Sequence, residues 1–507
     1  MQKLGMALKN IHHHHNQLHF VMFPLMAPGH MIPMIDMAKL IAKHGVAVTI
    51  VTTPVNATRF KSTINRAIES GLNIRLSQLE FPWQEAGLPE GCENVDMLPS
   101  LGYAINFIKA AAKLQEPMEK LLKELQPKPS CLISDYGFTW TTEVARKFNI
   151  PRIVFNGMSC CSLLSLHNLI AYNAIENVKS DTEPIQVPGL PDRIELTRTQ
   201  VPNAVHQAGD PLRVEMREAE RTAFGVVVNS FEELESEYLK RCKEAKGKNT
   251  IWCVGPVSLC NQDELDKGER GNKAALTVEK CMKWLDLHKP RSVIYACLGS
   301  LCNVVASQVM QLAFGLEASN KPFILAMREG YNLKEVERLI EEDGFRKRVE
   351  GRGLVILGWA PQVLILSHPS VGGFLTHCGW NSTLEGISTG LPMVTCPLFS
   401  EQFLNEKFVV EVLRVGASAR VENPTMNPGE EVRGISLDKE HVKHAIDLVM
   451  DDGKEGKEMR ERAARLAESA KKAVEKGGSS ERSLTLMIQD VIQEIEKDRE
   501  EVDKRVI

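Results

Sequence analysis

The chain has 507 residues, too many for one hydrophobic core, so two domains are expected. Hydrophobic residues make up 43% of it and charged residues 25%, which is typical of an ordinary soluble globular protein. The formal net charge of −4 gives no reason to expect a nucleic-acid partner.

The start of the chain and its cysteines indicate the kind of compartment. Residues 1–18 are mixed and polar and predict a flexible leader, whose His12–His15 cluster has no carboxylate or Cys beside it to support a metal site. The twelve cysteines form no Cys-x-x-Cys pair, which favours reduced thiols over a disulfide framework or a zinc site. No apolar run is long enough to span a membrane. We therefore expect a cytoplasmic protein without a membrane span, and a monomer.

In the first half of the chain, short apolar or β-branched runs alternate with longer amphipathic segments. This alternation is typical of parallel sheets covered by helices. The expected strands are residues 19–24, 46–52, 73–79, 131–135, 151–156 and 225–230. Residues 31–45 predict a helix that ends at Gly45, where a C-cap glycine belongs.

A second series of strands begins near residue 251. Its further members are residues 292–300, 322–328, 353–359, 371–377 and 391–397. Between the two series, the polar stretch 261–276 predicts an interdomain linker or an exposed loop. Residues 455–507 predict charged surface helices.

These patterns predict the α/β class, with two doubly wound Rossmann-like domains that face a cleft. The expected parts are an N-terminal domain 19–255, a linker 256–280, a C-terminal domain 281–475 and a C-terminal helix 476–507 that packs back on the first domain. In such sheets ligands bind at the C-terminal ends of the strands, so the cleft is the expected site.

The stretch "THCGWNSTLEG" (residues 376–386) predicts a strand-to-helix turn. Unpaired N–H groups at such a helix start bind phosphates. A structural explanation is equally good for this stretch alone, because Ser382 and Glu385 have the spacing of a capping box. On that explanation Trp380 is a core residue and His377 a hydrogen-bonded buried imidazole.

Two neighbouring motifs favour the binding site. The motif "WAPQ" begins with Trp359 at the end of an expected strand, where an indole offers a flat surface for a base. The motif "SEQF" contains Glu401 and Gln402, whose acceptors and donors suit a polyol. A base platform, a phosphate-binding helix start and a sugar-binding pair together indicate a nucleotide sugar.

Residues 359–402, "WAPQVLILSHPSVGGFLTHCGWNSTLEGISTGLPMVTCPLFSEQ", resemble the signature of the plant secondary-product glycosyltransferases, a branch of the family 1 UDP-glycosyltransferases. The stretches "FPLMAPGHMIPMIDMAKLIA" and "YACLGSL" extend the resemblance over nearly the whole chain. It implies a two-domain GT-B fold with the donor held mainly by the C-terminal half. The implied donor contacts are Trp359 and Ala360 on uracil, Gln362 and Glu385 on ribose, Gly299, Ser300, His377, Asn381 and Ser382 on the diphosphate, and Trp380, Glu401 and Gln402 on the sugar.

The first half supplies His30, after a Pro-Gly turn, and Asp135, at the end of an expected strand. A lone His is more often structural than catalytic, and an Asp at a strand end is also common as a helix or turn cap. An acceptor hydroxyl must lose its proton as it attacks, however, and His suits that task near neutral pH. The resemblance implies that His30 is the general base and Asp135 its partner, in a single displacement that inverts the anomeric carbon. We expect no metal and no other cofactor, because the sequence lacks an Asp-x-Asp motif.

Several residues refine this expectation. In the resembling family, Gln402 favours glucose over galactose, and the "EQF" ending is typical of enzymes that glucosylate triterpenoids, steroids and flavonoids. Glu401 replaces a common Asp, and Pro28 stands where relatives often carry Gln. No Arg lies near His30 or Trp380 in the sequence, which weighs against a glucuronate donor.

The acceptor site is expected in four first-half segments, residues 81–108, 136–142, 155–165 and 184–206. Their apolar residues suit a hydrophobic acceptor that offers a hydroxyl or carboxyl group: Phe81, Trp83, Phe107, Phe138, Leu163 and, just beyond, Leu166. The alternatives are another UDP-sugar donor, namely galactose or glucuronate, and a nucleotide-sugar-binding protein without catalysis. A dinucleotide-dependent oxidoreductase would need a G-x-G-x-x-G turn, which "PLMAPGHMIP" lacks.

Overall fold

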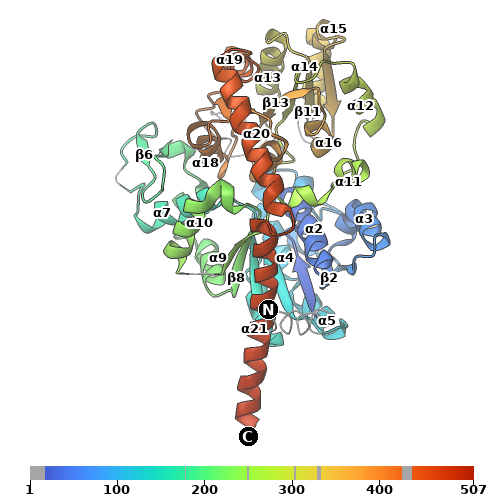
Figure 1. Ribbon diagram of the computed structural model, residues 1–507, viewed down its shortest axis with the longest axis vertical. Helices are drawn as coiled ribbons and strands as arrows, with labels where there is room; N and C mark the ends of the chain where they lie inside the picture. Colours follow the sequence, from blue (N-terminus) through green and yellow to red (C-terminus); the bar gives the residue numbers. More distant parts are fainter. Residues whose placement is uncertain are drawn as a thin grey trace.

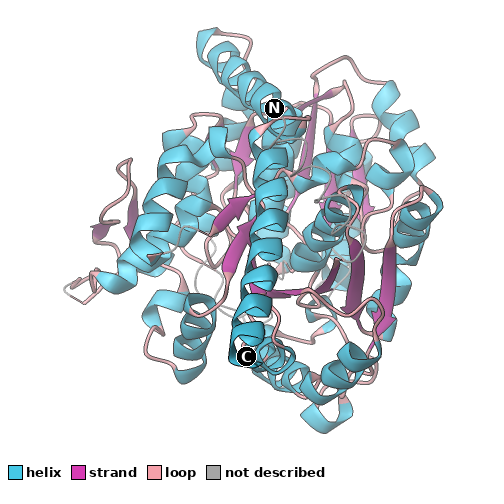
Figure 2. Cartoon of the chain, turned by 60° about the horizontal axis from the view of Figure 1, so that its bottom comes forward, coloured by secondary structure: helices cyan, strands magenta, loops and turns pink. Residues whose placement is uncertain are grey.

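The fold consists of two parallel sheets, each covered by helices on both faces (Figures 1 and 2). The computed structural model describes residues 18–176, 178–247, 250–301, 304–327, 333–424 and 437–506. The predicted leader, apart from Leu18, and its His12–His15 cluster lie outside the described residues. This arrangement agrees with the predicted α/β class and two Rossmann-like domains.

The first sheet has seven strands in the order β3-β2-β1-β4-β5-β8-β9, and all neighbouring pairs are parallel. Its strands are β1 (His19–Phe23), β2 (Ala47–Thr52), β3 (Ile74–Gln78), β4 (Cys131–Asp135), β5 (Arg152–Asn156), β8 (Gly225–Val228) and β9 (Ile251–Cys253). The assignment of a strand near residue 251 to the second series was wrong, because Ile251 pairs with Val226 of the first sheet.

Helices of the first domain connect these strands and bury apolar faces against them. They are α2 (Pro28–Lys43), α3 (Pro54–Glu69), α4 (Ala104–Ala112), α5 (Gln115–Glu124), α6 (Thr141–Phe148), α7 (Cys160–Ala171), α8 (Asn203–His206), α9 (Pro211–Arg221) and α10 (Glu232–Lys246). A two-stranded antiparallel hairpin of β6 (Pro184–Gln186) and β7 (Glu195–Thr197) extends from this domain. This hairpin was not predicted from the sequence.

The second sheet has six parallel strands in the order β12-β11-β10-β13-β14-β15. They are β10 (Val293–Cys297), β11 (Phe323–Met327), β12 (Gly353–Leu357), β13 (Val371–Thr376), β14 (Met393–Thr395) and β15 (Gly416–Ser418). The surrounding helices are α12 (Val278–Asp286), α13 (Ala306–Ala318), α14 (Leu333–Asp343), α15 (Phe345–Arg348), α16 (Gln362–Leu366), α17 (Trp380–Thr389), α18 (Gln402–Lys407) and α19 (Lys439–Val449).

Two long C-terminal helices join the domains. The first, α20 (Lys454–Val474), packs against α17 of the second domain, and α21 (Ser479–Val506) continues over the first domain (Figure 1). Buried residues of α21, among them Met487 and Val491, belong to the hydrophobic core of the first domain. The indole N–H of Trp252 donates to Asp490 at 3.1 Å. The chain end therefore fastens the two domains on one side of the cleft.

On the other side of the cleft, the linker between the sheets lies against both domains. Residues 261–276 include α11 (Glu264–Gly268) and the buried side chains of Asn261 and Arg270. Lys39 of α2 donates to Asn261 at 2.9 Å, and Arg66 of α3 pairs with Asp266 at 2.8 Å. Of the two alternatives predicted for it, the segment is the interdomain linker, and it is more than an exposed loop because several of its polar groups find partners in the first domain. We call residues 261–276 the strap.

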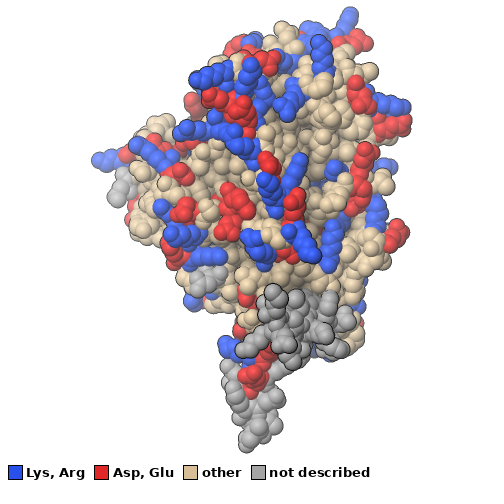
Figure 3. Space-filling view, viewed as in Figure 1, with Lys and Arg blue, Asp and Glu red and all other residues tan. Residues whose placement is uncertain are grey.

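The surface carries mixed charge. Lys and Arg side chains are interspersed with Asp and Glu over the face in Figure 3. Among the described residues, no helix has a stretch that is both long enough and apolar enough to cross a bilayer.

Candidate active site

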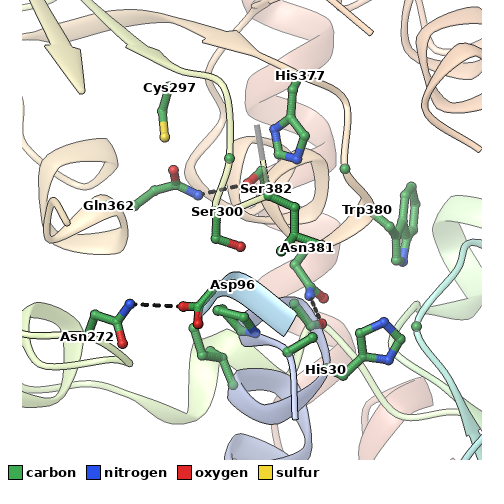
Figure 4. A pocket seen from close by; sticks show the side chains of 18 of the residues that line it. His30, Asp96, Asn272, Cys297, Ser300, Gln362, His377, Trp380, Asn381 and Ser382 are labelled. Atoms are coloured by element: carbon green, nitrogen blue, oxygen red, sulfur yellow. Dashed lines mark hydrogen bonds between the residues drawn. The ribbon is translucent and has the colours of Figure 1, made fainter. Parts of the chain in front are cut away.

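A cavity of about 920 Å³ lies between the two domains, at the carboxyl ends of the strands of both sheets. Its volume is at the upper end of the range usual for small-molecule sites. Figure 4 shows residues of both domains turned toward it. All residues that the sequence analysis assigned to catalysis or donor binding line this cavity: His30, Asp135, Gly299, Ser300, Trp359, Ala360, Gln362, His377, Trp380, Asn381, Ser382, Glu385, Glu401 and Gln402.

His30 and Asp135 form a hydrogen-bonded pair on the first-domain wall. His30 lies in the first turn of α2, just after β1, and Asp135 ends the adjacent strand β4. Pro28 occupies the first position of α2, where its missing N–H costs no hydrogen bond. The Nδ1 of His30 lies 2.6 Å from Oδ2 of Asp135, and Oδ1 accepts from the N–H of Gly137 at 3.1 Å. Because Nδ1 is engaged, Nε2 is the nitrogen available to a ligand.

Charge near His30 favours its protonated form. Burial lowers the pKa of His30, but the charge and hydrogen bond of Asp135 outweigh it, and Glu401 adds to them from across the cleft. The result is a pKa above the ordinary value for histidine. The His30 side chain remains 36% exposed while Asp135 is 2% exposed. An accessible imidazole with a buried carboxylate behind it is the arrangement that general bases use.

The start of α17 differs from the capping-box explanation. Gly379 is the N-cap and no side chain caps the helix. Ser382 is therefore the third helical residue, and Glu385 lies almost a turn further on. The capping-box part of the structural interpretation was wrong, because α17 begins before Ser382, whereas Trp380 is buried in the core as that interpretation expected. The hydroxyl of Ser382 instead accepts from the amide of Gln362 at 3.0 Å (Figure 4).

His377 is held against two glycines at the end of β13. A Cβ atom added to Gly299 or to Gly379 would lie 2.4 Å from its Nε2, so neither position has room for a side chain. Gly299 also has a φ of +81°, which favours glycine. Burial lowers the pKa of His377 to about 4, and its Nδ1 has no partner among the described residues. The imidazole is thus neutral at pH 7 in this state and can donate one N–H, but it carries no charge to offset that of a ligand.

Gln362 and Glu385, the two predicted ribose contacts, are hydrogen-bonded to each other. The amide NH₂ of Gln362 donates to Oε2 of Glu385 at 2.8 Å. The amide oxygen of Gln362 accepts from the hydroxyl of the buried Tyr295 at 3.4 Å. The other carboxylate oxygen of Glu385 accepts from Arg270 at 2.6 Å. Arg270 also pairs with Asp36 of α2. The sequence analysis missed Arg270, which lies among other charges in a polar linker and has no local pattern to distinguish it.

Trp359 follows β12 and is positioned by the strap. Its carbonyl accepts from the N–H of Ala275 at 2.9 Å. Gly271, with a φ of +98°, lies so close to the indole that a Cβ there would be 2.8 Å from Cζ2 of Trp359. Ala360 is buried beside it. The strap therefore covers one part of the indole while the remainder lines the cavity.

Two residues at the start of α17 contact the first domain. The buried indole N–H of Trp380 donates to the carbonyl of Asn229 at 2.7 Å. The carboxamide of Asn381 accepts from Asn229 at 3.2 Å and donates to the carbonyl of Gly29, next to His30. The predicted phosphate-binding helix start is therefore in direct contact with the turn that carries the predicted base. Sequence reasoning did not identify Asn229.

Glu401 and Gln402 close the cavity at the start of α18. Gln402 is buried, and its side-chain oxygen accepts from the N–H groups of Leu398 and Phe399 at 2.8 and 3.2 Å. This leaves the NH₂ group of Gln402 as its possible donor to a ligand. Glu401 is partly exposed on the cavity wall.

The acceptor wall differs in part from the sequence analysis. Three of the expected segments contribute to it, residues 81–108, 136–142 and 155–165, but residues 184–206 do not. The residues singled out in them are absent from the lining: Phe81, Trp83, Phe107, Phe138, Leu163 and Leu166. Most of these residues are buried in the core. The apolar lining comes instead from Leu25, Met97, Ile108, Tyr136, Met158 and Met216.

Among the described residues, no group of three or more His, Cys, Asp or Glu side chains is placed to hold a metal ion. The strap adds the cations Lys267 and Lys273 to the cavity wall.

The family model described as "UDP-glucoronosyl and UDP-glucosyl transferase" matches residues 139–449, and one described as "Glycosyltransferase, N-terminal domain" matches residues 16–259. The chain belongs to the plant family 1 UDP-glycosyltransferases. The resemblance noted in the sequence is thereby confirmed.

Similar proteins cover the chain almost from end to end. UDP-glycosyltransferase 73C3 of Arabidopsis thaliana is 53% identical over 96% of this chain and 99% of its own. UDP-glycosyltransferase 73C12 of Barbarea vulgaris is 51% identical over the same shares of the two chains.

Solved structures of this family have the same fold. Glycyrrhiza uralensis UGT73P12, complexed with glycyrrhetinic acid 3-O-monoglucuronide, is 34% identical, with a TM-score of 0.87 over 96% of this chain and 99% of that one. Medicago truncatula UGT71G1, complexed with UDP-glucose, is 25% identical, with a TM-score of 0.73 over 94% of this chain and 98% of that one. The fold is GT-B, as predicted, and the protein is a UDP-glycosyltransferase that transfers a glycosyl group to small molecules.

Proposed function

We propose that this UDP-glycosyltransferase is an inverting, UDP-glucose-dependent O-glucosyltransferase. Its acceptors are hydrophobic plant secondary metabolites such as triterpenoids, steroids or flavonoids, which offer a hydroxyl or carboxyl group. The observation that carries the proposal is that the His30–Asp135 pair lines the same cavity as Gln402 and the start of α17, which contacts Gly29 beside His30. A nucleotide-sugar-binding protein without catalysis would have no need of such a pair.

In the proposed reaction the acceptor hydroxyl attacks the anomeric carbon of the donor. Its proton passes to Nε2 of His30 as the new C–O bond forms. Asp135 holds the imidazole through Nδ1 and stabilises the imidazolium that results. The bond from the anomeric carbon to the phosphate oxygen breaks at the same time, and UDP leaves with the electron pair. Attack from the opposite face inverts the configuration.

The departing UDP gains negative charge, which the first turn of α17 is suited to stabilise. Its unpaired backbone N–H groups, the hydroxyl of Ser382 and an N–H of His377 supply hydrogen bonds without a fixed cation. Trp359 stacks on the uracil, and Gln362 with Glu385 binds the ribose. No metal ion is needed in this mechanism, since these protein groups serve the diphosphate.

Glucose is the proposed donor sugar because Gln402 keeps its NH₂ group for a sugar hydroxyl while its oxygen is used by the loop. The apolar wall of methionines and leucine, with Tyr136, supports a hydrophobic acceptor.

We further propose that the enzyme acts as a monomer in the cytoplasm. None of the eleven described cysteines forms a disulfide, which fits a reducing compartment.

A matrix of donors and acceptors tests the proposal. Purified enzyme is incubated with UDP-glucose, UDP-galactose or UDP-glucuronate and a flavonol, a triterpenoid, a steroid or a phenylpropanoid, with and without EDTA. Products are read by mass spectrometry, and the anomeric configuration by NMR. We expect β-glucosides from UDP-glucose at an unchanged rate in EDTA. Products with retained α-configuration, a preference for another donor, or loss of activity in EDTA would each contradict a named part of the proposal.

A further inference from the structure

The acceptor wall contains a positive charge that the proposed chemistry does not use. Helix α9 contributes Arg213 and Met216 to the cavity, three residues apart and thus on one face of the helix. No expected acceptor segment included this helix. Arg213 is half-buried and Met216 is buried.

Arg213 differs from the other arginines of the cavity because its guanidinium has no partner among the described residues. Arg59 forms an ion pair with Asp96 at 2.9 Å, and Arg270 pairs with Glu385 and with Asp36. Within the described part of the chain, the guanidinium of Arg213 makes neither a hydrogen bond nor an ion pair. A guanidinium that has lost part of its water and has no protein anion is well suited to a carboxylate, which it can bind through two parallel hydrogen bonds.

Arg217, one turn further along α9, provides an internal comparison. Its guanidinium donates to the carbonyl of Ala208, and Arg217 does not line the cavity. The nearby carboxylate of Glu220 is bonded to Lys246. The two arginines of this helix therefore have different surroundings, and Arg213 is the one that lines the cavity.

The surroundings of Arg213 belong to the acceptor half of the cavity. Tyr136, which directly follows Asp135, lies close enough that the charges of Arg217 and Arg213 oppose the effect of burial on its phenol. Burial, with the charge of Glu220, nevertheless raises the pKa of Tyr136 to about 12, so the phenol stays neutral and supplies no anion. The predicted donor contacts come instead from the second domain. A cation beside Tyr136 and Met216 thus faces the acceptor rather than the diphosphate.

We propose that Arg213 binds a carboxylate of the acceptor, so that the enzyme prefers hydrophobic acceptors with an acid group away from the hydroxyl that is glycosylated. The transfer of the sugar to such an acceptor rests on the proposed function, whereas the binding of its carboxylate by Arg213 does not. The apolar lining holds the skeleton of the acceptor, His30 faces the reacting hydroxyl, and Arg213 fixes the opposite end. Such a two-point attachment would also select which hydroxyl reaches the base.

Binding and transfer are measured separately on the full-length enzyme. Isothermal titration in the presence of saturating UDP gives the Kd of two acid and ester pairs of different length, 4-coumaric acid with its methyl ester and lithocholic acid with its methyl ester. We expect the wild type to bind at least one acid more tightly than its ester. Arg213→Met should weaken binding of that acid by about tenfold or more, as expected for a lost charge-assisted hydrogen bond. Binding of the ester should change little.

Matched variants separate the ligand contact from a general effect. Arg217→Met removes the same charge from the same helix and should leave the acid-to-ester ratio unchanged, while Arg213→Lys should retain part of the preference. An acid preference that is absent in the wild type for both pairs, or that survives Arg213→Met, would overturn the proposal. So would an equal loss in Arg217→Met.

A titration with UDP-sugars tests the other source of a carboxylate, which is the sugar of UDP-glucuronate rather than the acceptor. Arg213→Met should leave the Kd values of UDP-glucose and UDP-glucuronate unchanged. A selective loss of UDP-glucuronate binding would assign Arg213 to the donor and refute the acceptor assignment. If the acids bind as expected but no acceptor is glucosylated, the proposed reaction fails while the carboxylate site stands.

Discussion

Arg270 of the strap and Glu385 of α17 form a buried ion pair, with 2.6 Å between a guanidinium nitrogen and Oε1 of the carboxylate. Asp36 of α2 pairs with the same guanidinium. One side chain from the linker thereby joins the two domains and fixes the orientation of a proposed ribose contact. With Gln362 on its other oxygen, Glu385 is held in place before any donor arrives.

The first prediction concerns this ion pair. Arg270→Gln should raise the KM for UDP-glucose by about tenfold while kcat changes little, because a free Glu385 loses its orientation toward the ribose. It should also lower the free energy of unfolding by about 3–5 kcal/mol, since two buried carboxylates lose their counter-charge. Steady-state kinetics well below the melting temperature and denaturant titration check the two effects.

The control for Arg270 is Arg66→Gln. Arg66 attaches the same strap to α3 through Asp266 and Glu269 but does not touch Glu385. We expect the KM for UDP-glucose to stay within about twofold of the wild type, since partly exposed ion pairs contribute little. An equal rise in KM would show that docking of the strap, rather than orientation of Glu385, is what matters.

The second prediction tests the base. His30→Ala should reduce kcat by about a hundred- to ten-thousandfold, the usual contribution of a positioned base. The Kd of UDP should be unaffected, because the variant leaves the start of α17 intact. Single-turnover transfer and UDP titration measure the two quantities on the same preparation. Turnover at the wild-type rate would remove His30 from the proposed role.

The third prediction is a pH profile. As the proposed base, His30 works in its neutral form, and its pKa lies above the ordinary 6.5 because Asp135 favours the charged form. The value of kcat/KM should therefore rise with pH through an inflection above 6.5. Asp135→Asn removes the dominant favourable charge, so burial should move the inflection to lower pH while the plateau rate falls. Glu401→Gln should move it in the same direction by less. An inflection that Asp135→Asn leaves in place would contradict the pairing.

Much of this architecture could be predicted, and the parts that could not share a physical cause. Buried parallel strands are continuous apolar runs, so β4 (131–135) was predicted to the residue. By contrast, β15 and the two strands of the β6–β7 hairpin were not predicted. Each has three residues, which are too few to show a periodic pattern of apolar residues. Motifs at strand ends indicated part of the cavity lining, and the family resemblance implied the remaining donor contacts.

Residues whose function depends on distant contacts were not predictable. Arg270 meets a partner more than a hundred positions away, and Arg213 is distinguished only by a guanidinium that lines the cavity without a partner among the described residues. The same difficulty explains why Phe107 and Phe138 were wrongly assigned to the acceptor wall. An apolar side chain next to a site and one in the core look alike in a sequence, and both of these phenylalanines are fully buried.

The fourth prediction uses the packing of His377. Gly379→Ala places a Cβ 2.4 Å from Nε2 of His377 and must displace the imidazole. Gly379 has a φ of −60°, so the change is steric and adds no backbone strain. We expect UDP to bind about tenfold more weakly, as for the loss of a hydrogen bond to a charged group. Gly209→Ala, where a Cβ meets nothing within 4 Å, is the control and should bind UDP normally.

The fifth prediction concerns the donor sugar. Gln402→His should lower the use of UDP-glucose relative to UDP-galactose, because a ring nitrogen cannot reproduce both the acceptor and the NH₂ group of the amide. Gln402→Glu separates these functions: its carboxylate can still accept from Leu398 and Phe399 but offers no N–H to the sugar. It should keep the loop and the stability while losing turnover with UDP-glucose. The ratio of kcat/KM for the two donors tests the sugar contact, and the melting temperatures test whether the loop is kept. A glucose-to-galactose ratio that neither substitution changes would remove Gln402 from the sugar contacts.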